Sequence, residues 1–266
     1  MEDNQSILYH GAYSICALMV RYTLALKGPP KDDTSTLNVR EVSVDLFQGE
    51  HLTEEFLCEI NKYGQIPVLD TRKGTPIEDS LQITFFIAER YPNLIPKIHK
   101  EEITSLLKEL HGVNYFSLSF ADFGGARVAA GLAAAIEKLL QDPTISDRYR
   151  KALEFKLDVV KSFKVAGTEP ETIKEMERRA KVILDRLANT LPENSHESSV
   201  GPWMFGLQEP SALDAHAVVF IERMRDVGRI GLVPDKLDAY SQRATEQDAW
   251  RSVMNGRRTM APRPKA

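Results

Sequence analysis

The stretch Gln65-Ile66-Pro67-Val68-Leu69, followed by Glu78-Asp79-Ser80, decides how the first part of this chain is interpreted. A proline at the first position of a short apolar strand is tolerated at the edge of a sheet. If the Ile66–Pro67 bond is cis, the Ile66 N–H and C=O are exposed, and an extended peptide can pair with them as an added strand. The alternative is an ordinary edge-strand proline, and the sequence leaves both open.

Strand and helix patterns alternate around this stretch. Short apolar runs predict strands at residues 7–9, 67–69 and 76–77, the last two joined by a turn at Lys73-Gly74, and the alternation of Val42 and Val44 with polar neighbours predicts another. Helical patterns cover residues 14–27, 53–60 and 80–90, with Ser14 and Thr53 as N-caps. The order β-α-β-α-β-β-α predicts a small α/β layer domain over residues 1–92.

The character of the chain changes after Tyr91-Pro92-Asn93. No strand alternation follows, and helical patterns cover residues 103–123, 126–140, 147–163, 170–191 and 213–225. Ser211-Ala-Leu-Asp214 has the spacing of a capping box ahead of a run that is apolar nearly all round, which predicts a buried helix. We therefore expect an all-helical domain over residues 100–255 and a disordered basic tail over residues 256–266.

Composition limits the classes of function. The 266 residues carry a formal net charge of -4, so no bulk electrostatic attraction to nucleic acid or to an anionic membrane is expected. The two cysteines, Cys16 and Cys58, form no disulfide framework, and the polar N-terminus does not resemble a secretory signal. No apolar run reaches the length of a membrane span, and the histidines show no metal-ligand spacing. We therefore expect a cytoplasmic protein without a metal site.

Ser14 and Cys16 lie at the junction between a predicted strand and a predicted helix. Backbone N–H groups at such a junction are unsatisfied, and the helix dipole favours negative charge there. A hydroxyl group in this place can donate to a bound thiolate and lower its pKa from about 8.5. The alternatives are a plain N-cap for Ser14 and a small buried apolar residue for Cys16.

Charged and aromatic residues suggest binding roles. Asp79 suits an ammonium group, and the Ser80 hydroxyl at a helix start suits a carboxylate, although helix capping explains both residues equally well. His51 and Lys62 flank the second predicted helix and could meet a further carboxylate, with solvated surface groups as the alternative. Four aromatic residues could line a pocket or pack in the core: Tyr115, Phe116, Phe120 and Phe123.

The order of these segments resembles the cytosolic glutathione transferase family. Five segments carry the likeness: Ile7-Leu8-Tyr9, Ser14-Ile15-Cys16 with the helix up to Gly28, Gly49 to Leu57 with Asn61 and Gln65 to Leu69, Asp79-Ser80, and Ser211 to Asp214. The Ser-x-Cys loop is similar to that of the zeta class, which includes maleylacetoacetate isomerase. The long segment 124–166 resembles the enlarged helical domain of fungal transferases from natural-product gene clusters, including the pseurotin type.

The resemblance implies a thioredoxin-like α/β N-terminal domain, an all-α C-terminal domain that forms the electrophile-binding side, glutathione as the co-substrate, and a homodimer. Ser14 would stabilise the glutathione thiolate, with Cys16 beside it. Ile66 would pair with the cysteinyl backbone, Asp79 and Ser80 would hold the γ-glutamyl group, and His51 would reach the glycyl carboxylate. The expected glutathione-binding residues are His51, Lys62, Gln65, Ile66, Pro67, Asp79 and Ser80.

Four functions remain open at this point. The leading one is a glutathione transferase, whose thiolate adds to a small hydrophobic electrophile. The second is a glutathione-dependent cis-trans isomerase of a conjugated double bond in secondary-metabolite, polyketide-type biosynthesis. The third is a non-catalytic binding or regulatory protein on the same fold. In the fourth, Cys16 is the nucleophile of a thiol transferase.

Overall fold

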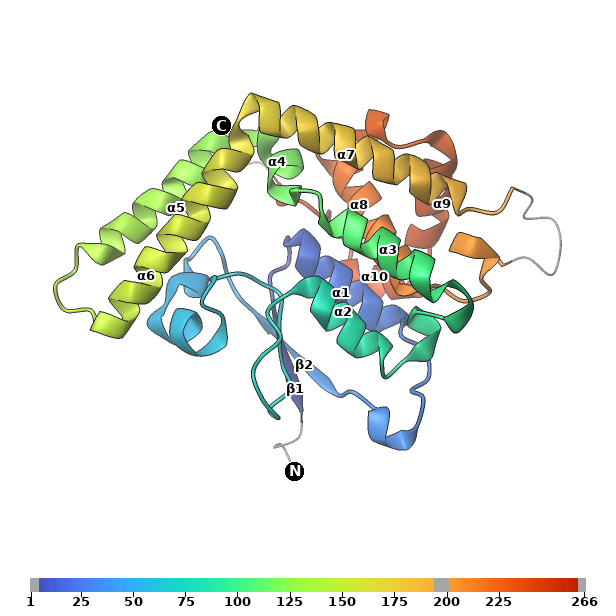
Figure 1. Ribbon diagram of the computed structural model, residues 1–266, viewed down its shortest axis with the longest axis horizontal. Coiled ribbons are helices and arrows are strands. Elements are labelled where there is room, and N and C mark those ends of the chain that lie inside the picture. The colour runs from blue at the N-terminus through green and yellow to red at the C-terminus, as the bar shows by residue number, and fades with distance from the viewer. Residues whose placement is uncertain (1–4, 194–200, 263–266) are drawn as a thin grey trace. The chain divides into compact units, whose positions relative to one another are not determined.

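The computed structural model describes residues 5–193 and 201–262, and the chain divides into two compact units (Figure 1). The first unit combines residues 5–11, 39–79 and 114–176, and the second combines residues 12–38, 80–113, 177–193 and 201–262. Each unit therefore draws on separate stretches of the chain. The contiguous division at residues 1–92 and 100–255 remains a prediction.

A small mixed sheet lies in the first unit. The strands β1 (Ser6–His10), β2 (Val39–Ser43) and β3 (Val68–Asp70) have the order β2-β1-β3. β1 runs parallel to β2 and antiparallel to β3, and Leu8 lies opposite both Glu41 and Leu69. Leu8 and Leu69 are buried, as the short apolar runs predict.

The prediction of a fourth strand at Pro76-Ile77 is wrong. Leu69 and Ile77 exchange two backbone hydrogen bonds of 2.9 Å, and this single bridge is all that forms. Pro76 has no N–H with which to extend the ladder. The turn before it also bends sharply, since Arg72 has a φ of 60°. The pairing therefore stops after one residue pair.

Helices make up the rest of the first unit. The predicted helix at 53–60 forms as a π-helix at Phe56–Ile60 (η3), whose Phe56 N–H donates to the Thr53 hydroxyl. A short 3-10 turn at Glu50–Leu52 (η2) precedes it. The longer helices are α4 (Tyr115–Phe120), α5 (Gly125–Leu140) and α6 (Asp147–Val159), and α6 continues into a π-helix at Val160–Val165 (η7). The prediction of one helical segment over residues 103–123 is wrong. The Asn114 side chain accepts from the N–H groups of Phe116 and Ser117, and a new helix, α4, begins there.

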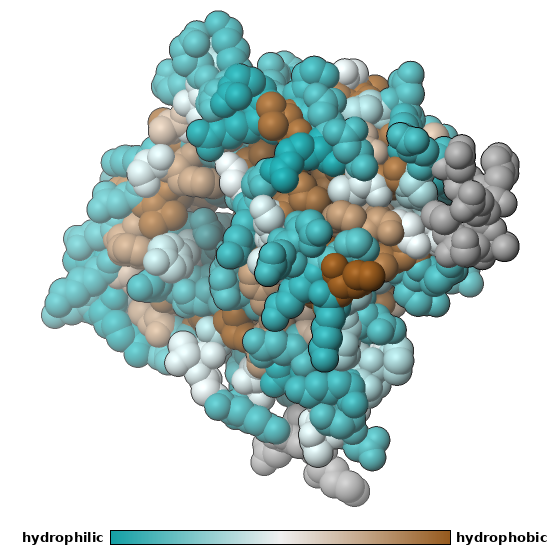
Figure 2. Space-filling view, turned by 45° about the vertical axis from the view of Figure 1, so that its right-hand side comes forward, coloured by the Kyte–Doolittle hydropathy of each residue, from teal (hydrophilic) through white to brown (hydrophobic). Residues whose placement is uncertain are grey.

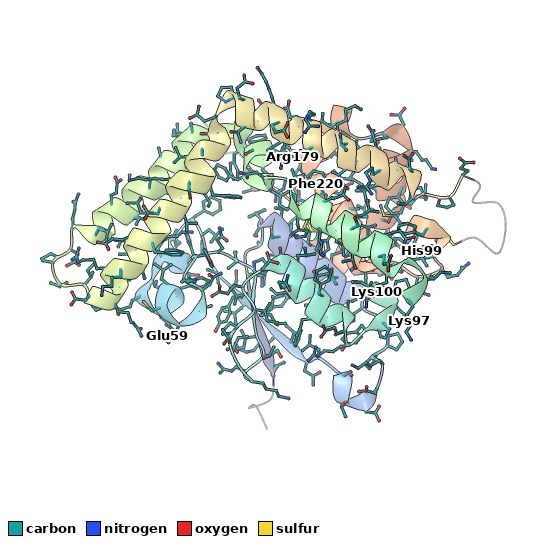
Figure 3. All side chains as sticks on the ribbon, in the orientation of Figure 1. Glu59, Lys97, His99, Lys100, Arg179 and Phe220 are labelled. Carbon is teal, nitrogen blue, oxygen red and sulfur yellow. The ribbon has the colours of Figure 1, made fainter. Side chains whose placement is uncertain are left out.

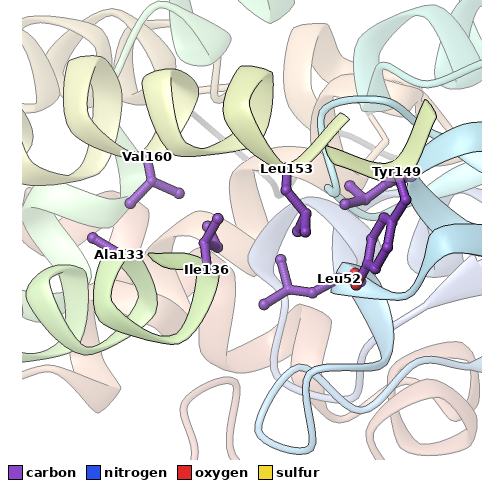
Figure 4. Close-up of a cluster of buried hydrophobic side chains, with 7 residues drawn as sticks. Leu52, Ala133, Ile136, Tyr149, Leu153 and Val160 are labelled. Carbon is purple, nitrogen blue, oxygen red and sulfur yellow. Dashed lines mark hydrogen bonds between the residues drawn. The ribbon is translucent and has the colours of Figure 1, made fainter. Parts of the chain in front are cut away.

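The helices α5 and α6 lie side by side and enclose an apolar cluster with the η2–η3 segment (Figures 1 and 4). The buried members of this cluster are Leu52, Leu57, Ala133, Ile136, Tyr149, Leu153 and Val160. Glu59 of η3, labelled in Figure 3, forms an ion pair of 2.6 Å with Arg148 of α6. The segment 124–166 is therefore packed directly against the stretch that leads to Ile66-Pro67.

The second unit is helical and has α8 (Ala212–Asp226) near its centre. The helices α1 (Ile15–Leu26), α3 (Lys100–His111) and α9 (Asp235–Thr245) contact α8, while α2 (Ser80–Ala88) and α10 (Asp248–Met254) contact α1. The end of α7 (Pro170–Asn189) also belongs to this unit. Phe220, labelled on α8 in Figure 3, is fully buried, so the prediction of a buried helix is confirmed.

The predicted capping box at the start of α8 is also confirmed. The Asp214 N–H donates to Ser211 Oγ at 3.4 Å, and the Ser211 N–H donates to Asp214 Oδ2 at 2.7 Å. Asp214 further accepts from Tyr240 Oη at 2.5 Å and from the Met204 N–H at 3.0 Å. These bonds satisfy a carboxyl group that is completely buried, and burial raises its pKa.

The expectation of a disordered tail is wrong for residues 256–262. Thr259 is buried, and both its N–H and its hydroxyl donate to Asp226 at 2.7 Å. Met260 is buried as well. Apolar burial and hydrogen bonds to α8 therefore order this part of the tail, while residues 263–266 lie outside the described residues.

Hydrophilic residues cover most of the face drawn in Figure 2, and hydrophobic residues show between them in small areas. Among the described helices, none has the length and hydropathy that crossing a membrane requires.

Candidate functional site

Ser14 caps the N-terminus of α1. Its backbone is extended (φ −75°, ψ 116°), and its hydroxyl oxygen accepts from the Ala17 N–H at 3.3 Å. Ser14 and Cys16 are both half-buried, and Cys16 is a free thiol in the first turn of the helix. The capping interpretation of Ser14 is confirmed. The catalytic role proposed for it is compatible with this position, because the hydroxyl lies at the N-terminus of a helix, where negative charge is favoured.

The backbone just before Ser14 is held by a residue that the sequence did not single out. Arg223 of α8 is buried and donates from Nη2 to the Tyr13 carbonyl at 2.7 Å and to the Thr259 carbonyl at 2.6 Å. Burial lowers its pKa to about 10, against the opposing influence of Asp226 and Cys16. Arg223 therefore fixes the entry into α1 and places a positive charge close to Cys16. The available signal was an arginine two residues after the apolar run of α8.

The loop from Asn61 to Pro67 is closed by a buried asparagine. Asn61 donates from Nδ2 to the Gln65 carbonyl at 3.0 Å and accepts from the Tyr63 N–H at 2.8 Å. Gly64 takes a φ of +54°, and the Ile66–Pro67 peptide bond is cis. Gln65 is exposed, Ile66 is half-buried, and Pro67 is buried.

His51 and Lys62 have different surroundings. His51 is 4% exposed, so the alternative of a solvated surface group is wrong for it. Burial, with Lys156 and Lys164 nearby, lowers the pKa of His51 to about 3, which makes the ring neutral at physiological pH. Lys62 is exposed, and its ammonium lies 5.2 Å from the centre of the Tyr63 ring.

The predicted binding residues Asp79 and Ser80 lie at the start of α2. Asp79 is exposed, and Ser80 is the buried first residue of the helix, whose carbonyl accepts from the Thr84 hydroxyl at 2.9 Å. Asp79 belongs to the first unit and Ser80 to the second. Burial raises the pKa of the neighbouring Glu78, and Lys62 opposes this shift.

The four predicted aromatic residues lie on α4 and in the turn that follows it. Tyr115 is buried, while Phe116, Phe120 and Phe123 are half-buried. The rings of Phe116 and Phe120 stack with their centres 4.7 Å apart. Lys164 lies over the Phe116 ring, with its ammonium 5.4 Å from the ring centre. The core role is therefore correct for Tyr115, and the three phenylalanines are partly accessible.

Some of the predicted site residues belong to the first unit and the others to the second. The first unit holds His51, Lys62, Gln65, Ile66, Pro67, Asp79 and the four aromatic residues, and the second holds Ser14, Cys16 and Ser80. Two basic residues in the first unit were missed: Lys156 and Lys164. Nothing in their local sequence distinguishes them from surface lysines, since their burial depends on the packing of α6 and η7.

Comparison with known proteins gives both sequence and structural relatives, while no family model matches. The chain is 40% identical over 98 residues to "Glutathione S-transferase 1" of Dianthus caryophyllus, across 36% of this chain and 40% of that protein. It is 28% identical over 156 residues to a glutathione S-transferase of Arabidopsis thaliana, across 57% of this chain and 66% of that protein. The matched parts thus span less than two thirds of both relatives.

Solved structures show the same fold along nearly the whole chain. The beta-etherase LigF of Sphingobium sp. strain SYK-6 aligns with a TM-score of 0.66 at 20% identity, over 94% of this chain and 99% of that one. An identity this low shows a shared fold and leaves the reaction open. The chain has the glutathione S-transferase fold, a thioredoxin-like part with a helical part, and over part of its length it is similar in sequence to two plant glutathione S-transferases.

Proposed function

We propose that this chain is a glutathione transferase in which Ser14 stabilises the glutathione thiolate for addition to a small hydrophobic electrophile. The position of the Ser14 hydroxyl at the N-terminus of α1 carries the proposal. A thiolate held there would accept the hydroxyl proton and would lie at the positive end of a helix of 12 residues. Arg223 supports this arrangement, because it anchors the Tyr13 carbonyl at 2.7 Å.

The remaining glutathione contacts belong to the same proposal. Ile66 pairs with the cysteinyl backbone, Asp79 and Ser80 hold the γ-glutamyl group, and His51 reaches the glycyl end. Lys62, Gln65 and Pro67 complete this set, and Phe116, Phe120, Phe123 and Tyr115 form the electrophile side. A homodimer in the cytoplasm is part of the same proposal, as are the zeta-like character of the loop and the likeness to fungal transferases of natural-product clusters.

The experiment that tests the proposal replaces Ser14 with alanine. We expect kcat/KM for glutathione conjugation of 1-chloro-2,4-dinitrobenzene to fall about 100-fold, as when one hydroxyl that stabilises a developing anion is removed. The pKa of the bound glutathione thiol, followed by thiolate absorbance, should rise towards about 8.5.

Ser146→Ala is the matched control. Ser146 caps α6 by accepting from the Tyr149 N–H at 3.0 Å, so both variants lose one N-cap, worth about 1 kcal/mol. Ser146→Ala also loses an exposed hydrogen bond of 2.7 Å to Glu54. The control should keep the turnover of the wild type. Equal turnover in wild type and Ser14→Ala would contradict the role of Ser14. A wild type that binds glutathione and turns over no electrophile would favour the non-catalytic alternative.

Isomerisation is a second candidate, favoured by the Ser14-Ile15-Cys16 loop. A thiolate that adds reversibly to a conjugated double bond leaves a single bond that can rotate, and elimination releases the other isomer with glutathione unchanged. Conversion of a cis-conjugated acid that depends on glutathione but does not consume it would support this reaction. Glutathione attached to Cys16 after treatment with oxidised glutathione, seen by mass spectrometry, would instead support the thiol-transferase mechanism.

A further inference from the structure

A lysine of the segment 124–166 reaches the loop that precedes Ile66-Pro67. Lys156 of α6 is 1% exposed, and its ammonium donates to the carbonyl oxygens of Tyr63 at 2.6 Å and Gly64 at 3.0 Å. An ammonium group has three donors, and these bonds use two of them. One donor of a buried cation is therefore left for another partner.

His51 lies against the same glycine. A Cβ atom on Gly64 would come within 3.1 Å of Lys156 Cε and within 3.0 Å of the His51 carbonyl oxygen. The His51 ring is buried, and its Nδ1 atom has no hydrogen-bond partner among the described residues. A buried polar atom of this kind normally has a partner, so the ring nitrogen could bind a polar group of a ligand.

The electrostatics of this region are one-sided. Burial and the charge of Lys164 lower the pKa of Lys156 to about 7, and burial also lowers the pKa of Lys164. Neither lysine forms an ion pair with a carboxylate in the described part of the chain. A buried cation without an anion, such as Lys156, is unfavourable, and a bound anion would remove that cost.

The basic region extends towards the aromatic residues of α4. Lys164 of η7 is half-buried, and its ammonium lies 5.4 Å from the centre of the Phe116 ring. Phe116 stacks on Phe120, so a basic group and an aromatic pair lie next to each other within the first unit.

We propose that His51, Lys156 and Lys164, called the basic cluster below, bind a carboxylate of the substrate. This rests on the proposed function, because glutathione is the expected ligand of the neighbouring loop. The carboxylate has two possible sources: the glycyl end of glutathione or an acidic group on the electrophile. In both cases the segment 124–166 contributes directly to substrate recognition, through Lys156 and Lys164.

Two pairs of probes distinguish the sources. S-hexylglutathione is compared with its glycyl ethyl ester, and 4-nitrocinnamate is compared with its methyl ester in the presence of S-methylglutathione. Binding of each probe to the full chain is measured by isothermal titration calorimetry. We expect the acid of one pair to bind about tenfold more tightly than its ester, as a charge-assisted hydrogen bond provides. The pair that shows this preference identifies the source.

Variants assign the preference to the basic cluster. Lys156→Met and Lys164→Met should each bind acid and ester within about twofold of one another, because the ester already lacks the charge that the lysine recognises. Lys151→Met is the matched control: Lys151 is exposed on the same helix and should leave the preference unchanged. If Lys156→Met does not fold, Lys164→Met decides by the same comparison.

Two outcomes would overturn the proposal. One is equal binding of acid and ester for both pairs in the wild type, and the other is a preference that survives in Lys164→Met and in folded Lys156→Met. These measurements need binding and no turnover, so their failure is distinct from loss of activity in Ser14→Ala. A preference for 4-nitrocinnamate that persists when S-methylglutathione is omitted would support the cluster as a site for an acidic electrophile that binds independently of glutathione.

Discussion

At the scale of single residues, Lys156 has the most unusual environment of the first unit. It is a lysine with 1% exposure whose two described partners are backbone carbonyls. Two effects act on its ammonium group. The carbonyls stabilise the charge, while burial and Lys164 oppose it, and the opposing effects lower its pKa to about 7.

This shift predicts how stability depends on pH. Below pH 7 the amine is protonated in both states, and the folded protein bears the full cost of the buried charge. As the pH rises through the folded pKa of about 7, the folded state releases the proton while the unfolded chain, with a pKa of 10.5, keeps it. The free energy of unfolding therefore rises, by about 2 kcal/mol from this residue between pH 7 and pH 9.

Urea unfolding of wild type and Lys156→Met at pH 7 and pH 9 checks this expectation. Comparison of the two proteins cancels the titration of all other groups to first order. The free energy of unfolding of the wild type, relative to that of the variant, should be about 2 kcal/mol higher at pH 9 than at pH 7. A difference that stays constant with pH would contradict the lowered pKa.

At the scale of elements, the α5–α6 pair supports the η2–η3 segment in two ways. Apolar side chains of the cluster in Figure 4 pack between them, with Leu153 at 0% exposure. Tyr149 Oη also donates to the Leu52 carbonyl at 2.6 Å. The η2 turn carries His51, so this packing positions a proposed binding residue.

Leu153→Ala tests that support. The substitution leaves a cavity and should lower the free energy of unfolding by about 3 kcal/mol. It should also weaken glutathione binding, because the η2–η3 segment loses its packing. Val182→Ala, at a position of α7 that is 49% exposed, should change stability by less than about 0.5 kcal/mol and leave binding unchanged. Unchanged glutathione affinity in Leu153→Ala would contradict a role for this apolar packing in positioning the site.

At the scale of the whole molecule, distant parts of the chain meet within the second unit. Arg223 joins the Tyr13 carbonyl near the start of the chain to Thr259 near its end, and Asp226 accepts from Thr259 in turn. The described end of the basic tail is therefore part of the support for the entry into α1.

Arg223→Met should remove this support. We expect the free energy of unfolding to fall by about 3 kcal/mol, since the Tyr13 and Thr259 carbonyls lose their charged donor. The KM for glutathione should also rise, because Ser14 directly follows Tyr13, whose carbonyl Arg223 holds. Arg225→Met, on the same helix, breaks half-exposed ion pairs with Glu222 and Asp238 and should cost about 1 kcal/mol. Equal destabilisation by the two variants in urea would contradict the special role of Arg223.

The sequence by itself determined the local features. Ser14 and Ser211 have the side chains and spacings of helix caps, and an N-cap depends on neighbours within four residues, so both predictions are confirmed. The strands at Leu8 and Leu69 follow from short apolar runs in the same way.

Only the tertiary structure decided which side chains from distant stretches meet. Lys156 reaches Gly64 from a helix far along the chain, and Arg223 reaches Tyr13 over a longer separation still. Burial of a charged side chain depends on which surfaces cover it, and no local pattern encodes that partner. The stretch at Ile66-Pro67 was therefore visible in the sequence, whereas the lysine that holds the carbonyls before it emerged only from the packing of α6.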